Sequence, residues 1–146
     1  QGAEDELVRD RVTALAVSPD GRTLATCSKT LFLRTWDLSG IVAAAQTRTR
    51  TRVAVPLLRS IRMAASGHKS AVASIAFHPS GELVATGGTD RAVMVWDVTA
   101  GFATHRFRGH SGVVHRVWWT GDFQLASAGA TGDSTLRFWS LTEQAQ

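Results

Sequence analysis

The sequence has one cysteine and three prolines in 146 residues, and it contains no tyrosine. The lone Cys27 excludes an internal disulfide and leaves no cysteine pair for a structural zinc site. We expect it to be a small buried side chain beside Thr26, the alternative being a reactive thiol. The apolar runs are only a few residues long, far short of the roughly 20 that a membrane-spanning helix needs. Disulfide-rich and helical membrane architectures are therefore excluded.

Motifs of the common enzyme classes are absent as well. The sequence has no Gly-Lys-Ser/Thr phosphate loop, no glycine-rich dinucleotide turn and no His-Glu-x-x-His run. Of its five histidines, His105 and His115 fall on different expected strands without the spacing of metal ligands. We therefore expect no catalytic residues, no cofactor, no metal and no small-molecule substrate. The chain starts at Gln1 without a signal-like segment, which indicates a processed or excised piece.

What the sequence does contain is a repeated unit, clearest from Gly67 to Asp97. It has three short runs in which apolar residues alternate with small or polar ones, as expected for strands. The runs cover residues 72–77, 83–87 and 92–98. Turn-forming residues separate them, first His78-Pro79-Ser80-Gly81 and then Gly88-Thr89-Asp90-Arg91. The unit is predicted to be an antiparallel meander.

Copies of this unit lie on both sides. Residues 109–140 repeat the Gly-His opening, the apolar strand, the small-residue strand and a closing Trp139. Residues 11–37 repeat everything except the Gly-His opening and close on Trp36-Asp37. The spacing from Trp96 to Trp139 falls within the 40–45 residues or so of a propeller blade.

These motifs resemble the WD-repeat family over roughly residues 8–142. The resemblance implies an all-β fold of about three four-stranded antiparallel blades from a larger, seven-bladed propeller. The blades are expected at residues 8–66, 67–108 and 109–142. Residues 102–108 are expected to form the outermost strand of the middle blade.

The family's buried tetrad of His, Ser or Thr, Asp and Trp falls on two of the copies. These residues are His68, Thr86, Asp90 and Trp96 in the middle copy, and His110, Ser127, Asp133 and Trp139 in the last. A hydroxyl, an imidazole and a carboxylate also make a catalytic triad. A set that recurs once per copy and ends in a tryptophan N–H, which can only donate, is better explained as a structural hydrogen-bond chain.

The first copy lacks both ionisable members of the tetrad. Thr26 supplies the hydroxyl, but Thr30 stands where the aspartate is expected and Val8 where the histidine is expected. Replacing both partners of a buried charged pair can leave stability nearly unchanged, whereas replacing one leaves the other buried and unpaired. We therefore predict a first blade without the tetrad.

An arginine-rich insert separates the first two copies at residues 41–60, within a stretch that has no acidic residue. Net charge is +4. One interpretation is a solvated, partly disordered loop. The other is an arm in which Arg48, Arg50 and Arg52 contact RNA phosphates.

A narrower resemblance lies in residues 10–38, 78–98 and 103–115. They are similar to the transducin-beta-like WD-repeat subunits of the UTP-B subcomplex of the small-subunit processome. The resemblance implies a non-enzymatic nucleolar scaffold in pre-18S rRNA processing and ribosome biogenesis, with other UTP-B subunits as partners and pre-rRNA or small nucleolar RNA nearby. The alternative is a peptide-reading adaptor in signalling or in a ubiquitin ligase.

In related propellers, partners contact the face that carries the loops before the first strand and between the second and third strands. The matching positions are Arg11, Thr13, Lys29, Ala71, Ala73, Thr89, Val113, His115 and Gly132. This predicted face is basic at one end and small or apolar across its middle, which suits an acidic or apolar segment. The alternative is that Arg11 and Lys29 are merely solvated rim charges.

Overall fold

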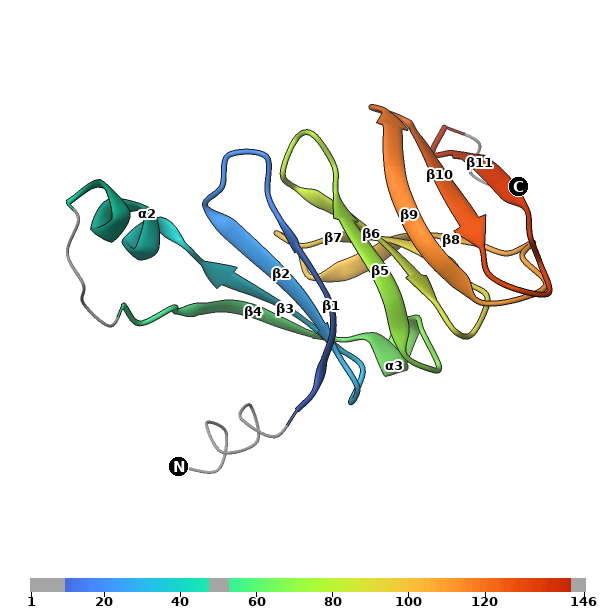
Figure 1. Cartoon of the computed structure of the whole chain (residues 1–146), viewed down its shortest axis with the longest axis horizontal. Helices are drawn as coiled ribbons and strands as arrows, with labels where there is room; N and C mark the ends of the chain where they lie inside the picture. Colours follow the sequence, from blue (N-terminus) through green and yellow to red (C-terminus); the bar gives the residue numbers. More distant parts are fainter. Residues whose placement is uncertain (1–9, 48–52, 143–146) are drawn as a thin grey trace.

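The computed structural model describes residues 10–47 and 53–142 and contains three antiparallel sheets side by side (Figure 1). The first sheet has β1 (Val12–Val17), β2 (Thr23–Ser28), β3 (Phe32–Asp37) and β4 (Leu57–Arg62). The second has β5 (Val72–Phe77), β6 (Leu83–Gly88), β7 (Val93–Asp97) and β8 (Phe102–Phe107). The third has β9 (Val114–Gly121), β10 (Gln124–Gly129) and β11 (Leu136–Ser140). The expected all-β architecture of antiparallel blades is confirmed, and the total number of blades stays a prediction.

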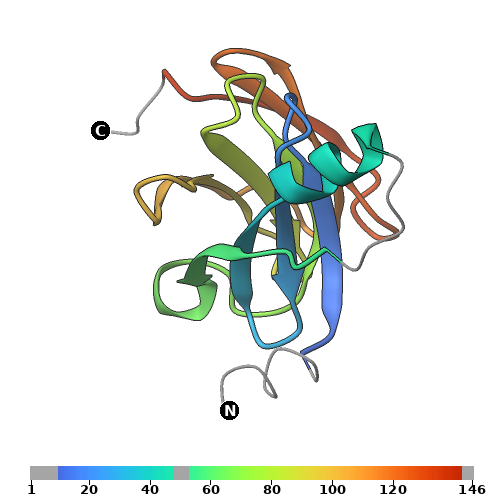
Figure 2. The ribbon, with the colours of Figure 1, turned by 90° about the vertical axis from the view of Figure 1, so that its left-hand side faces the viewer.

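Each sheet is a meander in which neighbours in sequence are neighbours in space. The turn between β5 and β6 shows how the sequence directs this. The Gly81 N–H donates to the His78 carbonyl at 2.9 Å, and Gly81 adopts a φ of 77°, a conformation that costs glycine little. Figure 2 looks onto the first sheet, with β1 at one edge and β4 at the other.

The insert at 41–60 contains a helix at its start and a strand at its end, and residues 53–56 between them have neither helix nor strand. Its start belongs to α2 (Ser39–Gln46), because the alanine-rich run at 43–45 favours a helix. Its end belongs to β4, which pairs with β3 as the outermost strand of the first sheet. The Asp37 N–H donates to the Pro56 carbonyl at 2.9 Å and closes the base of the excursion. Arg48, Arg50 and Arg52 lie outside the described residues.

A second short helix, α3 (Met63–Ser66), carries the chain from β4 to the second sheet. In the ranges that the structure describes, neither helix is long and apolar enough to cross a membrane.

Two apolar clusters hold the sheets together, one in each gap between neighbouring sheets. Between the first and second sheets, Cys27 and Leu33 pack with Trp96 and other buried side chains. Between the second and third, Val95 packs with Val117. Cys27 is fully buried, as expected, and burial raises the pKa of its thiol, so it behaves as a small apolar side chain.

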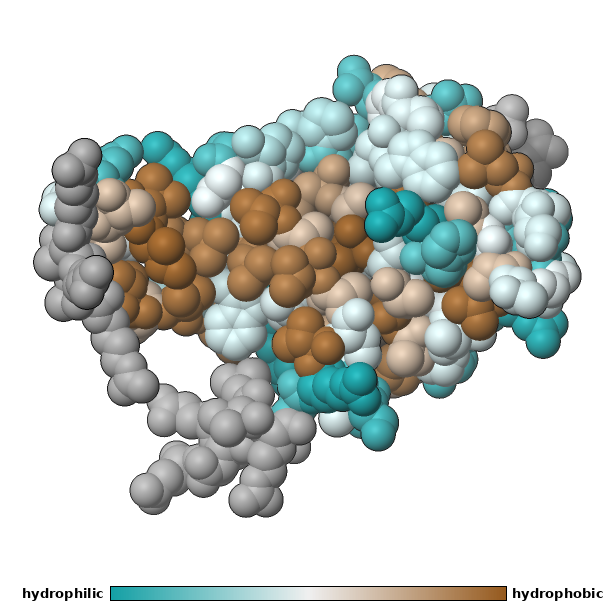
Figure 3. Space-filling model, viewed as in Figure 1, coloured by the Kyte–Doolittle hydropathy of each residue, from teal (hydrophilic) through white to brown (hydrophobic). Residues whose placement is uncertain are grey.

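The outward sides of the first and third sheets are apolar and open. Leu15 pairs with Thr26 as Ile75 pairs with Thr86, yet Ile75 is 8% exposed and Leu15 is 61% exposed. On the outward side of the third sheet, Phe138 is 58% exposed. We call Leu15, Val17 and Trp36 the leading face, and Trp118, Leu136 and Phe138 the trailing face. Figure 3 shows apolar side chains in a band between α2 and the second sheet, over β1.

Candidate protein-interaction surface

A hydrogen-bond chain runs through the second sheet. The Trp96 indole N–H donates to the Thr86 hydroxyl oxygen at 2.9 Å. The Thr86 hydroxyl lies 2.7 Å from Nε2 of His68, and Nδ1 of His68 lies 3.0 Å from Asp90. The neutral tautomer with its proton on Nδ1 lets each group use its donors: Trp96 donates to Thr86, Thr86 to His68 and His68 to Asp90. The structure thus brings together the four residues chosen by spacing in the middle copy.

The third sheet repeats the chain. Trp139 donates to the Ser127 hydroxyl at 2.8 Å, Ser127 lies 2.6 Å from Nε2 of His110, and Nδ1 of His110 lies 2.8 Å from Asp133. The hydroxyl of Thr135, reinforced by His110 and two backbone N–H groups, lowers the pKa of Asp133.

In neither hydrogen-bond chain is the hydroxyl group accessible enough to act as a nucleophile. The hydroxyl-bearing residues Thr86 and Ser127 are both 0% exposed, and an indole N–H occupies an oxygen lone pair in each. A substrate cannot reach these oxygens. The arrangement ties the segment that precedes each sheet to its second and third strands.

Asp90 is held in its charged form. Burial opposes that form, but hydrogen bonds from His68 and from the N–H groups of Lys69 and Ala92 outweigh burial and set the pKa at about 2. Because this lies below the unfolded value of about 3.9, the stabilisation is present above that pH and is lost as pH falls from about 4 to about 2.

We expect Asp90→Asn to lower the free energy of unfolding of the full-length protein by about 1–3 kcal/mol at pH 7, because His68 loses its charged acceptor. The variant should also lose part of the acid-induced fall in melting temperature between pH 4 and 2. Scanning calorimetry across that range measures both effects, with exposed Glu82→Gln as the control. An acid profile in Asp90→Asn as steep as in the wild type would contradict this assignment.

The first sheet has an acid that the sequence interpretation missed. The Thr30 hydroxyl and N–H both donate to the Asp10 carboxylate, and the Arg34 guanidinium lies 2.8 Å from it. Burial opposes the charge of Asp10, but hydrogen bonds from Ser28, Thr30 and Arg34 outweigh it and set the pKa at about 2. The first blade without the tetrad stays a prediction, because among the described residues Asp10 bonds to Thr30 and Arg34 and to no histidine, but this sheet does have an acid of its own.

Compared with the second sheet, the acid and a hydroxyl have exchanged positions in the first sheet. In the second sheet the acid lies in the turn between the second and third strands, whereas in the first sheet it lies just before the first strand and the hydroxyl of Thr30 lies in the turn. Arg34 pairs with Thr26 as Met94 pairs with Thr86, and it supplies the positive charge. The indole of Trp36 still donates to Thr26 at 2.9 Å. Val8 lies outside the described residues.

The predicted face gathers at one edge of the molecule. Within each sheet a backbone hydrogen bond ties the loop after the second strand to the start of the first. The three bonds run from Lys29 to Arg11 at 2.8 Å, from Thr89 to Ala71 at 2.9 Å and from Ala130 to Val113 at 2.7 Å. These ends lie along the lower edge in Figure 1. Exposed members of the face are Arg11, Lys29, Ala73, Thr89, His115 and Gly132.

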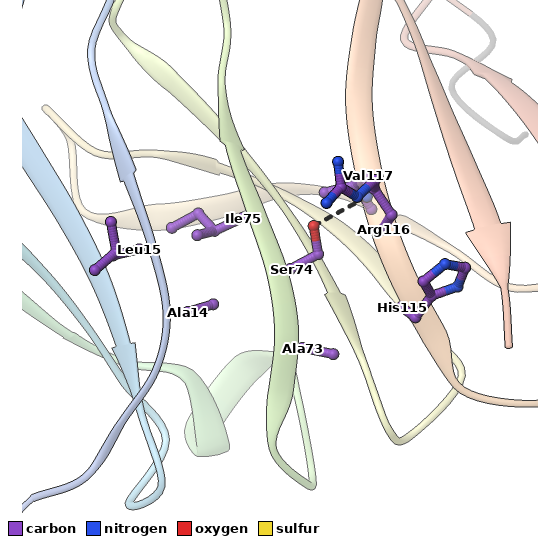
Figure 4. Close-up of a pocket in the computed structure, with 8 residues that line it drawn as sticks. All are labelled: Ala14, Leu15, Ala73, Ser74, Ile75, His115, Arg116 and Val117. Atoms are coloured by element: carbon purple, nitrogen blue, oxygen red, sulfur yellow. Dashed lines mark hydrogen bonds between the residues drawn. The ribbon is translucent and has the colours of Figure 1, made fainter.

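A hollow of about 310 Å³ lies where β1, β5 and β9 come together (Figure 4). Its lining is Ala14, Leu15, Ala73, Ser74, Ile75, His115, Arg116 and Val117. Ile75 points towards β1, and the Val117 N–H donates to the Ser74 hydroxyl at 3.1 Å. Of the predicted face, Ala73 and His115 line the hollow, whereas the others lie outside its lining.

Sequence reasoning missed Arg116, which gives this apolar and polar hollow a positive charge. Its position next to His115 in the sequence was the available signal.

Sequence reasoning also missed an apolar hollow of about 660 Å³ beside Phe123, which is 64% exposed. There His78 bonds to the Asp122 carbonyl at 2.9 Å and packs edge-on against Trp119. Among the described residues, no three His, Cys, Asp or Glu side chains gather as metal ligands.

Comparisons with known proteins agree with this geometry. The family model "WD domain, G-beta repeat" matches residues 8–37, 59–97 and 101–140. Transducin beta-like protein 3 of Bos taurus is 39% identical over 137 residues, which are 93% of this chain and 15% of that protein. Nuclear distribution protein PAC1 of Arthroderma benhamiae is 31% identical over 123 residues, covering 84% of this chain and 24% of its own length.

A solved structure, the crystal structure of RRP9 WD40 repeats, superposes with a TM-score of 0.74 at 22% identity, covering 94% of this chain and 37% of that one. At that identity the likeness concerns the fold. The chain spans about 15% of the length of the transducin beta-like relative. The repeated sheets, the tetrads and the match over three repeats together lead to one conclusion: this chain belongs to the WD40 repeat family.

Proposed function

We propose that this chain is part of a non-enzymatic scaffold subunit of the nucleolar small-subunit processome, acting in pre-18S rRNA processing and ribosome biogenesis. The observation that carries the proposal is the 39% identity to transducin beta-like protein 3 across 93% of the chain. In this role the propeller holds other protein subunits of a UTP-B-like complex. The buried tetrads keep the loops in place, and the loops meet the partners.

The predicted face suits an acidic or apolar partner segment. Arg11 and Lys29 are exposed at one end, and Ala73 lies beside the hollow between β1, β5 and β9. Charge complementarity sets encounter and register, whereas an uncharged centre is inexpensive to desolvate. Arg116 adds a cation inside the hollow.

Arg48, Arg50 and Arg52 are proposed to lie near RNA. Clustered arginines neutralise backbone phosphates without requiring a folded site, and such binding weakens as salt rises. No protein partner needs to be invoked for this segment.

Two double charge reversals separate these roles. Arg11→Glu with Lys29→Glu in the full-length protein should weaken partner binding by about tenfold, because two favourable charge contacts become repulsive. Arg50→Glu with Arg52→Glu should weaken salt-dependent RNA binding and leave partner binding unchanged. Affinity purification and RNA filter binding measure the two effects. If only the insert pair has any effect, the predicted face is not a partner surface.

A second candidate function is a peptide-reading adaptor in signalling or in a ubiquitin ligase. The 31% identity to nuclear distribution protein PAC1 keeps a second candidate in view, because the name of that relative states a role other than ribosome biogenesis. Purification of the full-length protein decides between the two. Recovery with U3 small nucleolar RNA and UTP-B subunits supports the scaffold, whereas recovery with a ligase core or one short linear peptide supports the adaptor.

A further inference from the structure

A recess of about 440 Å³ lies at the junction of the second and third sheets, next to the predicted face but lined by other residues. Four basic side chains line it, and all four residues are exposed. They are Lys69, Arg91, Arg106 and Arg108. The rest of the lining is Asp90, Ala92, Gly109 and His110. The recess is therefore strongly cationic.

The one carboxylate in this lining is already engaged. Oδ1 of Asp90 accepts from His68 and from the Ala92 N–H, and Oδ2 accepts from the Lys69 N–H. Both oxygens of this carboxylate are therefore occupied by hydrogen bonds with the tetrad histidine and nearby backbone. None of the ion pairs among residues 10–47 and 53–142 involves the arginines of the recess. Their positive charge is available to a ligand.

The fold places these arginines together. Arg106 is the penultimate residue of β8, and Arg108 follows one residue after the strand ends, so both line the recess from one short stretch of chain. Arg91 comes from the turn between β6 and β7 and adopts a φ of 69°. Gly109 lets a further cation approach, because a Cβ there would lie 3.0 Å from the Arg137 guanidinium.

We propose that this recess binds the phosphate group of a phosphorylated serine or threonine in a segment of a partner protein. Arginine forks match phosphate oxygens in paired hydrogen bonds, and a phosphate offers three acceptor oxygens. Four lining cations against one engaged carboxylate leave an excess of positive charge. A phosphate of charge near −2 balances that excess better than a single carboxylate does.

The shape of the recess favours protein over RNA as the source of the phosphate. Single-stranded nucleic acid binds through a basic track together with aromatic rings on which bases stack. The only ring in this lining is that of His110, which is 6% exposed and held in its tetrad. The recess shares no residue with the predicted face or the insert, so its failure would leave the proposed function untouched.

The test uses immobilised full-length protein and a degenerate peptide library with one fixed phosphoserine. The same library after phosphatase treatment, a glutamate-substituted library and a mixed-sequence 20-nucleotide RNA are the other probes. We expect selective retention of the phosphoserine library. Arg106→Ala with Arg108→Ala should reduce it by about tenfold or more, since charged hydrogen bonds to phosphate are lost. Arg22→Ala with Arg62→Ala, which removes two exposed arginines elsewhere, should leave it unchanged.

Arg91→Gly guards against an effect of misfolding. Glycine adopts the positive φ at this position readily, so the variant should keep the wild-type melting temperature while losing phosphopeptide. Equal retention of the phosphatase-treated library overturns the proposal, as does equal loss in the control pair. Loss of RNA binding in Arg106→Ala with Arg108→Ala, without phosphopeptide binding in the wild type, also overturns it and makes the recess a nucleic-acid site.

Discussion

The 146-residue chain produced alone is expected to run as oligomers or aggregates in light scattering, and not as a monomer. Its leading face exposes Leu15 at 61% and its trailing face exposes Phe138 at 58%. Exposed apolar sheet faces associate with one another. In the described residues β11 also pairs on one side only, which leaves an open edge for a further strand.

Leu15→Glu with Phe138→Glu should shift the isolated chain towards the monomer, because each carboxylate resists burial. In the full-length protein the same pair should destabilise, since we expect neighbouring blades to cover both faces. Phe102→Glu with Phe123→Glu is the matched control. These rings are 55% and 64% exposed but lie outside both faces, so the control should not restore the monomer. A wild-type chain that is monomeric and unfolds in one transition would contradict its place in a larger propeller.

Trp96→Ala is expected to lower the free energy of unfolding of the full-length protein by about 3–5 kcal/mol. The Trp96 side chain is fully buried between the first two sheets, and its N–H ends the hydrogen-bond chain at Thr86. Its ring also fills the space over Gly67, where a Cβ would come within 2.5 Å of the indole. Chemical denaturation measures the loss.

Trp96→Phe separates the two contributions. It keeps most of the ring volume but removes the donor to Thr86, so we expect a loss of about 1–3 kcal/mol. Phe123→Ala removes an exposed ring and should change stability by no more than about 0.5 kcal/mol. A Trp96→Ala loss as small as that of Phe123→Ala would show that the tetrad tryptophan does not hold the sheets together.

The strands of the middle blade could be predicted almost residue by residue, because alternation and turn chemistry are local. The expected run at 72–77 coincides with β5, and the run at 83–87 ends one residue before β6 does. β4 was missed because Leu57–Arg62 has no alternation, and its strand conformation depends on pairing with β3. An edge strand of this kind is specified by its neighbour more than by its own pattern.

The candidate sites divide in the same way. The tetrad positions follow from fixed spacing within a repeat. Asp10 and Arg116 could not be placed in this manner, because their surroundings come from different strands or different sheets. The recess around Arg106 likewise exists only once the second and third sheets meet. Contacts between repeats depend on how whole sheets pack, which one repeat does not encode.

The hydrogen bond between Asp37 and Pro56 has an evolutionary consequence. The chain leaves and re-enters the first sheet at the same point, so the intervening segment can be gained, lost or lengthened without shifting the register of β3 against β4. Each doubling of a flexible loop adds only about 0.6 kcal/mol of closure entropy. The sequence of this segment, including its arginines, can therefore change during evolution with little effect on the stability of the fold.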